Sequence, residues 1–220
     1  MNALDLGIRR ILLASDVHRP LTPLIDAVAQ LAATLDASLA ALYVEDLDLI
    51  HSAALPFTRE IGLLLQGNRP LDSNEVARSL RRDTTRVQQA IAKAAQRLNV
   101  PWTFRVEQGR LLRQLLELGG GQELVIAGAV ATGGPNTDSI RSGPIVVVGS
   151  SSEAGKRSLE VATRLAAGMR CSVHRQSTFD PSARALRPSL VVVAADTSPD
   201  AKREIADLAR LIGCGLVLSP

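Results

Sequence analysis

Side chains able to do metal or nucleophilic chemistry are few and scattered along this chain. The three histidines, His18, His51 and His174, form no HxxxH or HxH pair, and such spacings are typical of metal-binding histidines. The two cysteines, Cys171 and Cys214, exclude a disulfide scaffold and a cysteine-built zinc site, and they fit a reducing compartment. No GxSxG nucleophile elbow occurs. We therefore expect no metal site and no catalytic constellation.

Two glycine-containing segments invite comparison with phosphate-binding loops. A P-loop needs four residues between its glycines and a Lys followed by Ser or Thr. The segment from Gly149 to Lys156 has five such residues, and Arg157 follows it, so we interpret it as a serine-rich N-cap of a helix. The other segment, ATGGPN, contains Gly133 and Gly134. It either forms a cradle of backbone N–H groups or, more simply, a tight loop with positive φ.

Short apolar runs alternate with amphipathic segments, which predicts a three-layer, mostly parallel α/β sheet. Strands are expected at 11–15, 38–44, 102–106, 123–128, 145–149, 171–177, 189–194 and 215–218. Helices are expected at 24–35, 70–98, 111–118 and 200–212, with a short one broken at Pro56 within 49–67. Ligands of such sheets bind beyond the carboxyl ends of the strands. This points to Asp16, the turn at 44–46 and the loop after Gly128, although Asp16 could instead cap the next helix.

A shift of 134 residues lays the opening of the chain over a second copy. Residues 11–15 then match 145–149, and Ser38 matches Ser172 without a gap. The second copy lacks counterparts of the long helix and the third strand, and Ser150 replaces Asp16. We therefore predict two units, 1–142 and 143–220, of which the second is a reduced α/β unit kept for packing.

Residues 8–128 contain four informative segments, RRILLASD, ALYVED, WTFRVEQG and ELVIAG, and a long helix before the third of them. Through these features residues 8–128 resemble the universal stress protein family. Residues 143–220 more weakly resemble a degenerate tandem copy. The resemblance implies a universal-stress-protein-like fold with adenine nucleotide alpha hydrolase-like topology. It also implies dimerisation and, in many members, binding of ATP without known turnover. By this resemblance Asp16 and Val44 would hold the adenosine part of ATP or another adenine nucleotide.

The same resemblance places the phosphates on a loop with the pattern Gly, two residues, Gly, nine residues, Gly and Ser or Thr. Gly128 fits the first position and Ser142 the last, but Ala131 and Arg141 replace the other two glycines. Our leading hypothesis is therefore a non-catalytic stress-response or regulatory protein with a weakened or lost nucleotide site. The alternative is an adenine-nucleotide-binding module that uses Asp16, Val44 and the 128–134 loop. A third hypothesis, an adenylate-forming enzyme, lacks the SGGxDS and HxGH signatures.

Partners follow from charge and from sheet edges. The long helix is rich in basic residues, namely Arg78, Arg81, Arg82, Arg86, Lys93 and Arg97. Such a run is usually a solvated face whose side-chain stems cover apolar surface; as a binding surface it favours an acidic protein partner over nucleic acid. Aromatic residues make up only 2%, so we expect no nucleic-acid binding. An open strand edge predicts a homodimer or an intramolecular pseudo-dimer. No apolar run reaches 18 residues and no signal peptide is apparent, so we expect a cytoplasmic protein without membrane contact.

Overall fold

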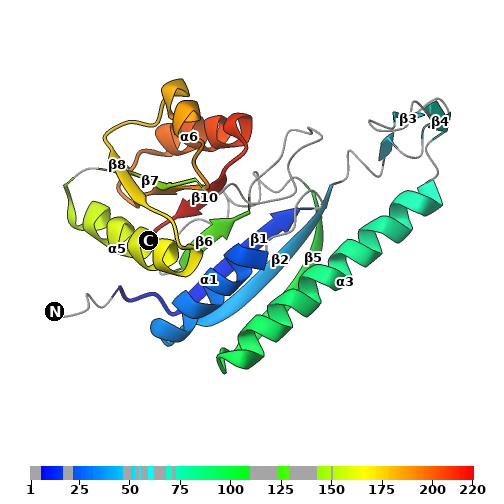
Figure 1. The fold of residues 1–220 in the computed structure, drawn as a ribbon, viewed down its shortest axis with the longest axis horizontal. Helices are drawn as coiled ribbons and strands as arrows, with labels where there is room; N and C mark the ends of the chain where they lie inside the picture. The colour runs from blue at the N-terminus through cyan, green and yellow to red at the C-terminus, as the bar shows by residue number, and fades with distance from the viewer. Residues whose placement is uncertain are drawn as a thin grey trace.

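An eight-stranded sheet forms the centre of the molecule (Figure 1). The computed structural model describes residues 6–16, 22–46, 51–52, 55, 59–61, 68–70, 73–109, 123–128, 143–149 and 151–220. In spatial order the strands are β5 (Trp102–Gly109), β2 (Ser38–Asp46), β1 (Arg10–Asp16), β6 (Glu123–Ala127), β10 (Gly215–Leu218), β9 (Leu190–Val193), β7 (Ile145–Val148) and β8 (Val173–Gln176). Both halves of the chain therefore contribute to one sheet.

The sheet consists of two parallel halves that meet at a single antiparallel pair. Each neighbouring pair of strands is parallel except β6 and β10, in which Val217 lies opposite Ile126 and Leu216 opposite Ala127. The carboxyl ends of β1, β2, β5 and β6 therefore point to one edge of the sheet, and those of β7, β8, β9 and β10 point to the opposite edge. Any ligand sites at these ends lie on opposite sides of the molecule.

Helices cover both faces of the sheet and form the outer two layers. Buried side chains of α1 (Thr22–Thr34), α3 (Ser73–Arg97) and α5 (Glu153–Met169) share one apolar cluster with alternate strand residues. Those of α6 (Pro199–Ile212) and the 3-10 turn η1 (Pro181–Leu186) belong to the cluster on the other face. The predicted α/β class with a three-layer, mostly parallel sheet is confirmed.

The predicted short helix within 49–67 is wrong for the described part of that segment. Only residues 51–52 are helical, while β3 (Arg59–Ile61) and β4 (Asn68–Pro70) pair as a small antiparallel sheet. Pro70 belongs to β4, and α3 begins at Ser73 rather than at Pro70. The residue before a proline disfavours the helical conformation, which fits Arg69 in a strand, and strands of three residues are too short to show periodicity. The helix predicted at 111–118 lies outside the described residues.

The two halves also meet through a close contact between helices α1 and α5. A Cβ added at Gly168 of α5 would lie 3.0 Å from both the Cα and the Cβ of Ala27 in α1. A glycine inside a helix costs about 0.5–1 kcal/mol relative to alanine, so its presence here is explained by this approach of two backbones. The second half is thus joined to the first by a strand pair and by a helix pair.

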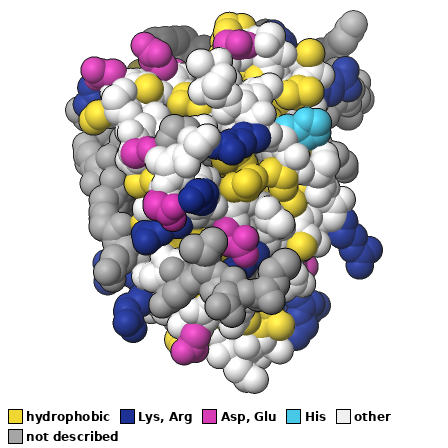
Figure 2. Space-filling view, turned by 90° about the vertical axis from the view of Figure 1, so that its left-hand side faces the viewer, with side chains coloured by type: hydrophobic (Ala, Val, Ile, Leu, Met, Phe, Trp, Pro, Cys, Tyr) yellow, Lys and Arg dark blue, Asp and Glu magenta, His cyan; other side chains and the backbone are white. Residues whose placement is uncertain are grey.

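Strand β8 forms one end of the sheet and carries polar residues. His174 and Arg175 on this strand are exposed, and the strand is only four residues long. Figure 2 looks at this side of the molecule and shows acidic and basic side chains interspersed over it. Short, charged edge strands resist pairing with other chains, so this end of the sheet is a poor site for assembly.

Candidate functional site

Three of the predicted site residues meet at the carboxyl edge of the first half. Asp16 at the end of β1 lies in register with Val44 of β2. On the other side of β1, the N–H of Gly128 donates a hydrogen bond to the carbonyl oxygen of Ala14 at 3.0 Å. The chain runs from β1 to β2 on one side and has β6 on the other, so this is a point where strand order reverses. Crevices at such points are the usual ligand sites of open α/β sheets.

Two of these residues already make contacts within the protein: Val44 through its side chain and Gly128 through its N–H. Val44 is 1% exposed and packs in the apolar cluster on the α6 face. Gly128 uses its N–H in the sheet, so this group is not directed at a phosphate. Asp16 is placed by its backbone register alone, because its side chain lies outside the described part of the structure. The described residues therefore fit an adenosine group only in part.

The predicted phosphate loop is not described by the structure. Gly133, Gly134 and Ser142, and with them the substituted positions Ala131 and Arg141, all lie outside the described residues. Residues 149 and 151–156 of the segment from Gly149 to Lys156 are described, and there the interpretation as an N-cap is confirmed. The hydroxyl oxygen of Ser152 accepts a hydrogen bond from the N–H of Gly155 at 3.0 Å, at the start of α5.

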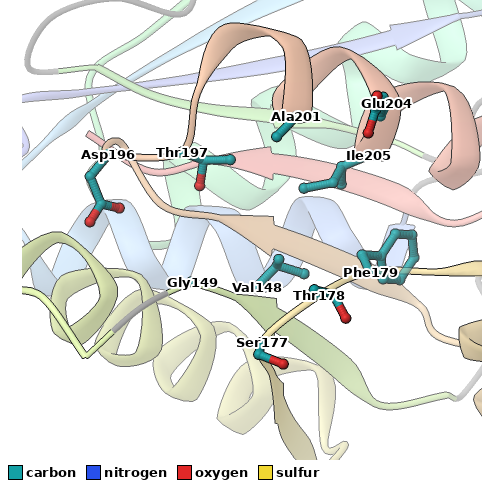
Figure 3. A pocket seen from close by; sticks show the side chains of 10 residues that line it. All are labelled: Val148, Gly149, Ser177, Thr178, Phe179, Asp196, Thr197, Ala201, Glu204 and Ile205. Atoms are coloured by element: carbon teal, nitrogen blue, oxygen red, sulfur yellow. The ribbon is translucent and has the colours of Figure 1, made fainter.

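A pocket that sequence reasoning missed lies at the opposite, second-half edge (Figure 3). Its volume is about 440 Å³, which is within the usual range of about 300–1,000 Å³ for small-molecule sites. It is lined by Val148, Gly149, Ser177, Thr178, Phe179, Asp196, Thr197, Ala201, Glu204 and Ile205. These residues form no motif, so the only available signal was that Asp196 follows a strand, as Asp16 does.

One wall of this pocket is held by a capped turn. Asp180 caps η1 by accepting a hydrogen bond from the N–H of Ser182 at 2.8 Å, and it also accepts one from the Ser182 hydroxyl. Both hydrogen bonds lower the pKa of Asp180, and the one from the Ser182 hydroxyl has the larger effect. The stability contributed by this cap is present above the ordinary aspartate pKa and is lost as pH falls through the lowered one.

Neither the thiols nor the histidines of the described residues form a reactive or metal-binding cluster. Burial raises the pKa of the Cys171 thiol, which makes it a weaker nucleophile at neutral pH. Cys214 is a buried free thiol. Among the described residues, no three His, Cys, Asp or Glu side chains gather closely enough to hold a metal ion. Among the described helices, none is long and apolar enough to cross a membrane.

The basic residues of α3 lie mostly on its exposed side. Arg78, Arg81, Arg82 and Arg86 are exposed. Arg86 pairs with Asp83 at 3.3 Å on the same helix. Near the other end, Arg97 pairs with Asp26 of α1 at 2.9 Å. Lys93 and Arg97 are exposed as well, so the basic residues of the predicted partner surface are spread along the whole helix.

Comparison with known proteins gives structural similarity alone. No family model matches the chain, and no curated protein matches it by sequence. The chain is similar to a universal stress protein from Archaeoglobus fulgidus DSM 4304, with 8% identity, a TM-score of 0.43 and coverage of 95% of each chain. It is similar to a protein of the universal stress protein family from Burkholderia pseudomallei, with 18% identity, a TM-score of 0.35 and coverage of 80% of this chain and 98% of that one. It is also similar to the cytoplasmic domain of a prokaryotic cation chloride cotransporter, with 11% identity, a TM-score of 0.36 and coverage of 96% and 95%.

Proposed function

We propose that this chain is a non-catalytic stress-response or regulatory protein of the universal stress class, with a weakened or lost nucleotide site. The proposal rests on how three residues are used at the carboxyl ends of the first-half strands. Asp16, Val44 and Gly128 meet there, yet Val44 is buried in the core and the Gly128 N–H is used in the sheet. Burial of Val44 and use of the Gly128 N–H within the sheet support a weakened or lost site, because fewer groups are left to contact a nucleotide.

The alternative function is an adenine-nucleotide-binding module built from Asp16, Val44 and the 128–134 loop. The convergence of β1, β2 and β6 supports it, because this is where strand order reverses. The two functions differ in whether purified protein carries nucleotide. No observation on the described residues favours the adenylate-forming enzyme.

Nucleotide extraction tests the proposal directly. Heat-extracted full-length protein should release far less than one adenine nucleotide per chain, measured by chromatography of the supernatant. Any residual ATP binding, measured by calorimetry, should fall about tenfold or more in Asp16→Ala. Loss of a hydrogen bond to a charged group costs about 1.5–3 kcal/mol.

Asp207→Ala is the matched control, because it removes an exposed carboxylate from α6 in the second half. It should leave ATP affinity unchanged. Stoichiometric nucleotide in the extract would establish the alternative function instead. ATP binding that survives Asp16→Ala would show that the first-half edge is not the site.

We propose that the protein works in the cytoplasm. Cys171 and Cys214 are both free thiols, which supports a reducing compartment.

We further propose that the second half acts as an internal pseudo-partner of the first. Pairing of β10 with β6 and contact of α5 with α1 support this. A homodimer would use the remaining long edge, β5, which is eight residues long and exposes Val106 by 44%. Long open edges with apolar residues favour pairing with another chain.

An acidic protein partner would dock on the exposed arginines of α3. Arg81→Glu combined with Arg82→Glu should weaken binding of polyglutamate by full-length protein about tenfold or more at low salt. Each exposed charge pair contributes up to about 1 kcal/mol, and two charge reversals replace two attractive contacts by two repulsive ones. Arg203→Glu combined with Arg210→Glu on α6 is the control. If both double variants lose binding equally, the effect is one of net charge and α3 is not the docking surface.

A further inference from the structure

The pocket in the second half lies where strand order reverses for a second time. From β7 the chain passes through α5 on one face of the sheet to β8, while from β9 it passes through α6 on the other face to β10. Val148 and Gly149 end β7, and Asp196 and Thr197 follow β9. The cavity therefore occupies the crevice that this topology opens between the two diverging connections, which is the general ligand position in such sheets.

The backbone around this crevice is tightly held. A Cβ at Gly149 would lie 3.2 Å from the Cβ of Ala194, so the ends of β7 and β9 come together closely and a larger residue at 149 would require Ala194 to shift by a few tenths of an ångström. The N–H of Thr197 donates to the carbonyl oxygen of Ala194 at 3.1 Å, which closes a turn beside the pocket. The next residue, Ser198, caps α6 by accepting a hydrogen bond from the N–H of Ala201 at 3.3 Å. The pocket is thus formed by ordered turns rather than by a long loop.

The pocket has an apolar middle and an acidic group toward each end. Val148, Phe179 and Ile205 are buried apolar residues of its lining. Figure 3 shows Asp196 beside Thr197 at one end and Glu204 above Ile205 toward the other. Both carboxylates are exposed to solvent at the rim. Of the ten described lining residues, two are acidic and none is basic.

Two basic residues that neighbour the lining along the chain, Lys202 and Arg175, are not part of it. Lys202 directs its ammonium group to the carbonyl oxygen of Ala195 at 2.8 Å. Arg175 donates to the hydroxyl of Ser151 at 3.4 Å. The partial positive charge at the start of α6 is faced by Asp200 in its first turn, and the N–H of Ala201 is taken by Ser198. These features make the pocket unfavourable for a phosphate group.

We propose that this pocket binds a linear diamine, a small molecule with two ammonium groups separated by an apolar chain. One ammonium group pairs with Asp196 and the other with Glu204, while the methylene chain packs on Val148 and Ile205. Hydroxyls of Ser177, Thr178 and Thr197 accept the remaining N–H hydrogen bonds. The second half is then a ligand-binding unit and more than a packing element. This inference does not depend on the proposed function, since the first-half site lies at the opposite edge of the sheet.

The test is a titration of the full-length chain with 1,5-diaminopentane, in which heteronuclear NMR measures the chemical shifts of the backbone amides. Saturable changes in chemical shift are expected at Gly149, Thr178 and Thr197. Affinity should exceed that of 1-aminopentane about threefold to fivefold, as expected for one further exposed ion pair, and 1,5-pentanediol should bind more weakly than either. Glu204→Gln should lower the affinity for the diamine to that for the monoamine. Ala201→Phe, which fills the pocket from a partly exposed helix position, should abolish binding.

Asp200→Asn is the matched control, because it removes one negative charge from the same helix outside the lining. It should bind the diamine as the unchanged chain does. The proposal is overturned if the monoamine or the diol binds as tightly as the diamine, or if Asp200→Asn weakens binding as much as Glu204→Gln. It is equally overturned if ATP produces the pocket shifts at concentrations where the diamine does not.

Discussion

A chain that ends at Ser142 should aggregate or form irregular oligomers, and its unfolding should lose the cooperativity of the full-length protein. In the intact chain β6 is paired on one side by β10, and Leu124 and Ile126 of β6 are fully buried. Truncation removes β10 and also uncovers the side of α1 that contacts α5. An exposed apolar strand edge recruits other chains. Light scattering after size-exclusion chromatography, together with thermal denaturation, measures both effects.

Adding residues 143–220 as a separate chain is the control for this experiment. If the second half is an internal pseudo-partner, the two pieces should form a one-to-one complex and scattering should fall. The mass of the full-length chain in the same run reports whether a homodimer forms through β5. A truncated chain that stays monomeric and is as heat-stable as the full-length protein would rule out the pseudo-partner.

Gly168→Leu should produce the largest loss of stability from a single substitution at the junction of the halves. Even the Cβ atom would lie 3.0 Å from Ala27, and the remaining side-chain atoms would force α1 and α5 apart. Overpacking of this kind costs about 1–3 kcal/mol and occasionally more. For a chain of this size each kcal/mol lowers Tm by about 2–4 °C. Urea denaturation should therefore show a lower midpoint.

Ala167→Leu provides the matched control, because Ala167 is the preceding residue of α5 and is exposed. It adds the same side chain to the same turn of the helix without facing α1, so its free energy of unfolding should change by less than about 0.5 kcal/mol. Equal destabilisation by the two variants would mean that a leucine is costly anywhere on this turn of α5, and that contact between the halves does not set the effect. A Gly168→Leu protein as stable as the original would place the junction elsewhere.

The predictable part of the fold is the part with a local signal. Strands buried on both faces appear in the sequence as unbroken apolar runs, and all four residues of Ile145–Val148 and of Leu190–Val193 are buried. Amphipathic periodicity likewise located α1 and α6. The signal failed at β3, within 49–67, and at β4 just after it, because these strands are three residues each and depend on each other for backbone hydrogen bonds.

Local patterns were enough to predict the α/β class, the positions of the main strands and the meeting of Asp16, Val44 and Gly128, because residues at the ends of neighbouring parallel strands must share an edge. They could not predict that β10 enters beside β6 in the antiparallel direction, that Gly168 lies against Ala27, or that Asp196 and Glu204 line one pocket. The difference lies in the range of the interactions. Periodicity and capping act over a few residues, whereas strand order, helix contacts and cavities depend on residues far apart in the chain, whose pairing leaves no regular spacing to detect.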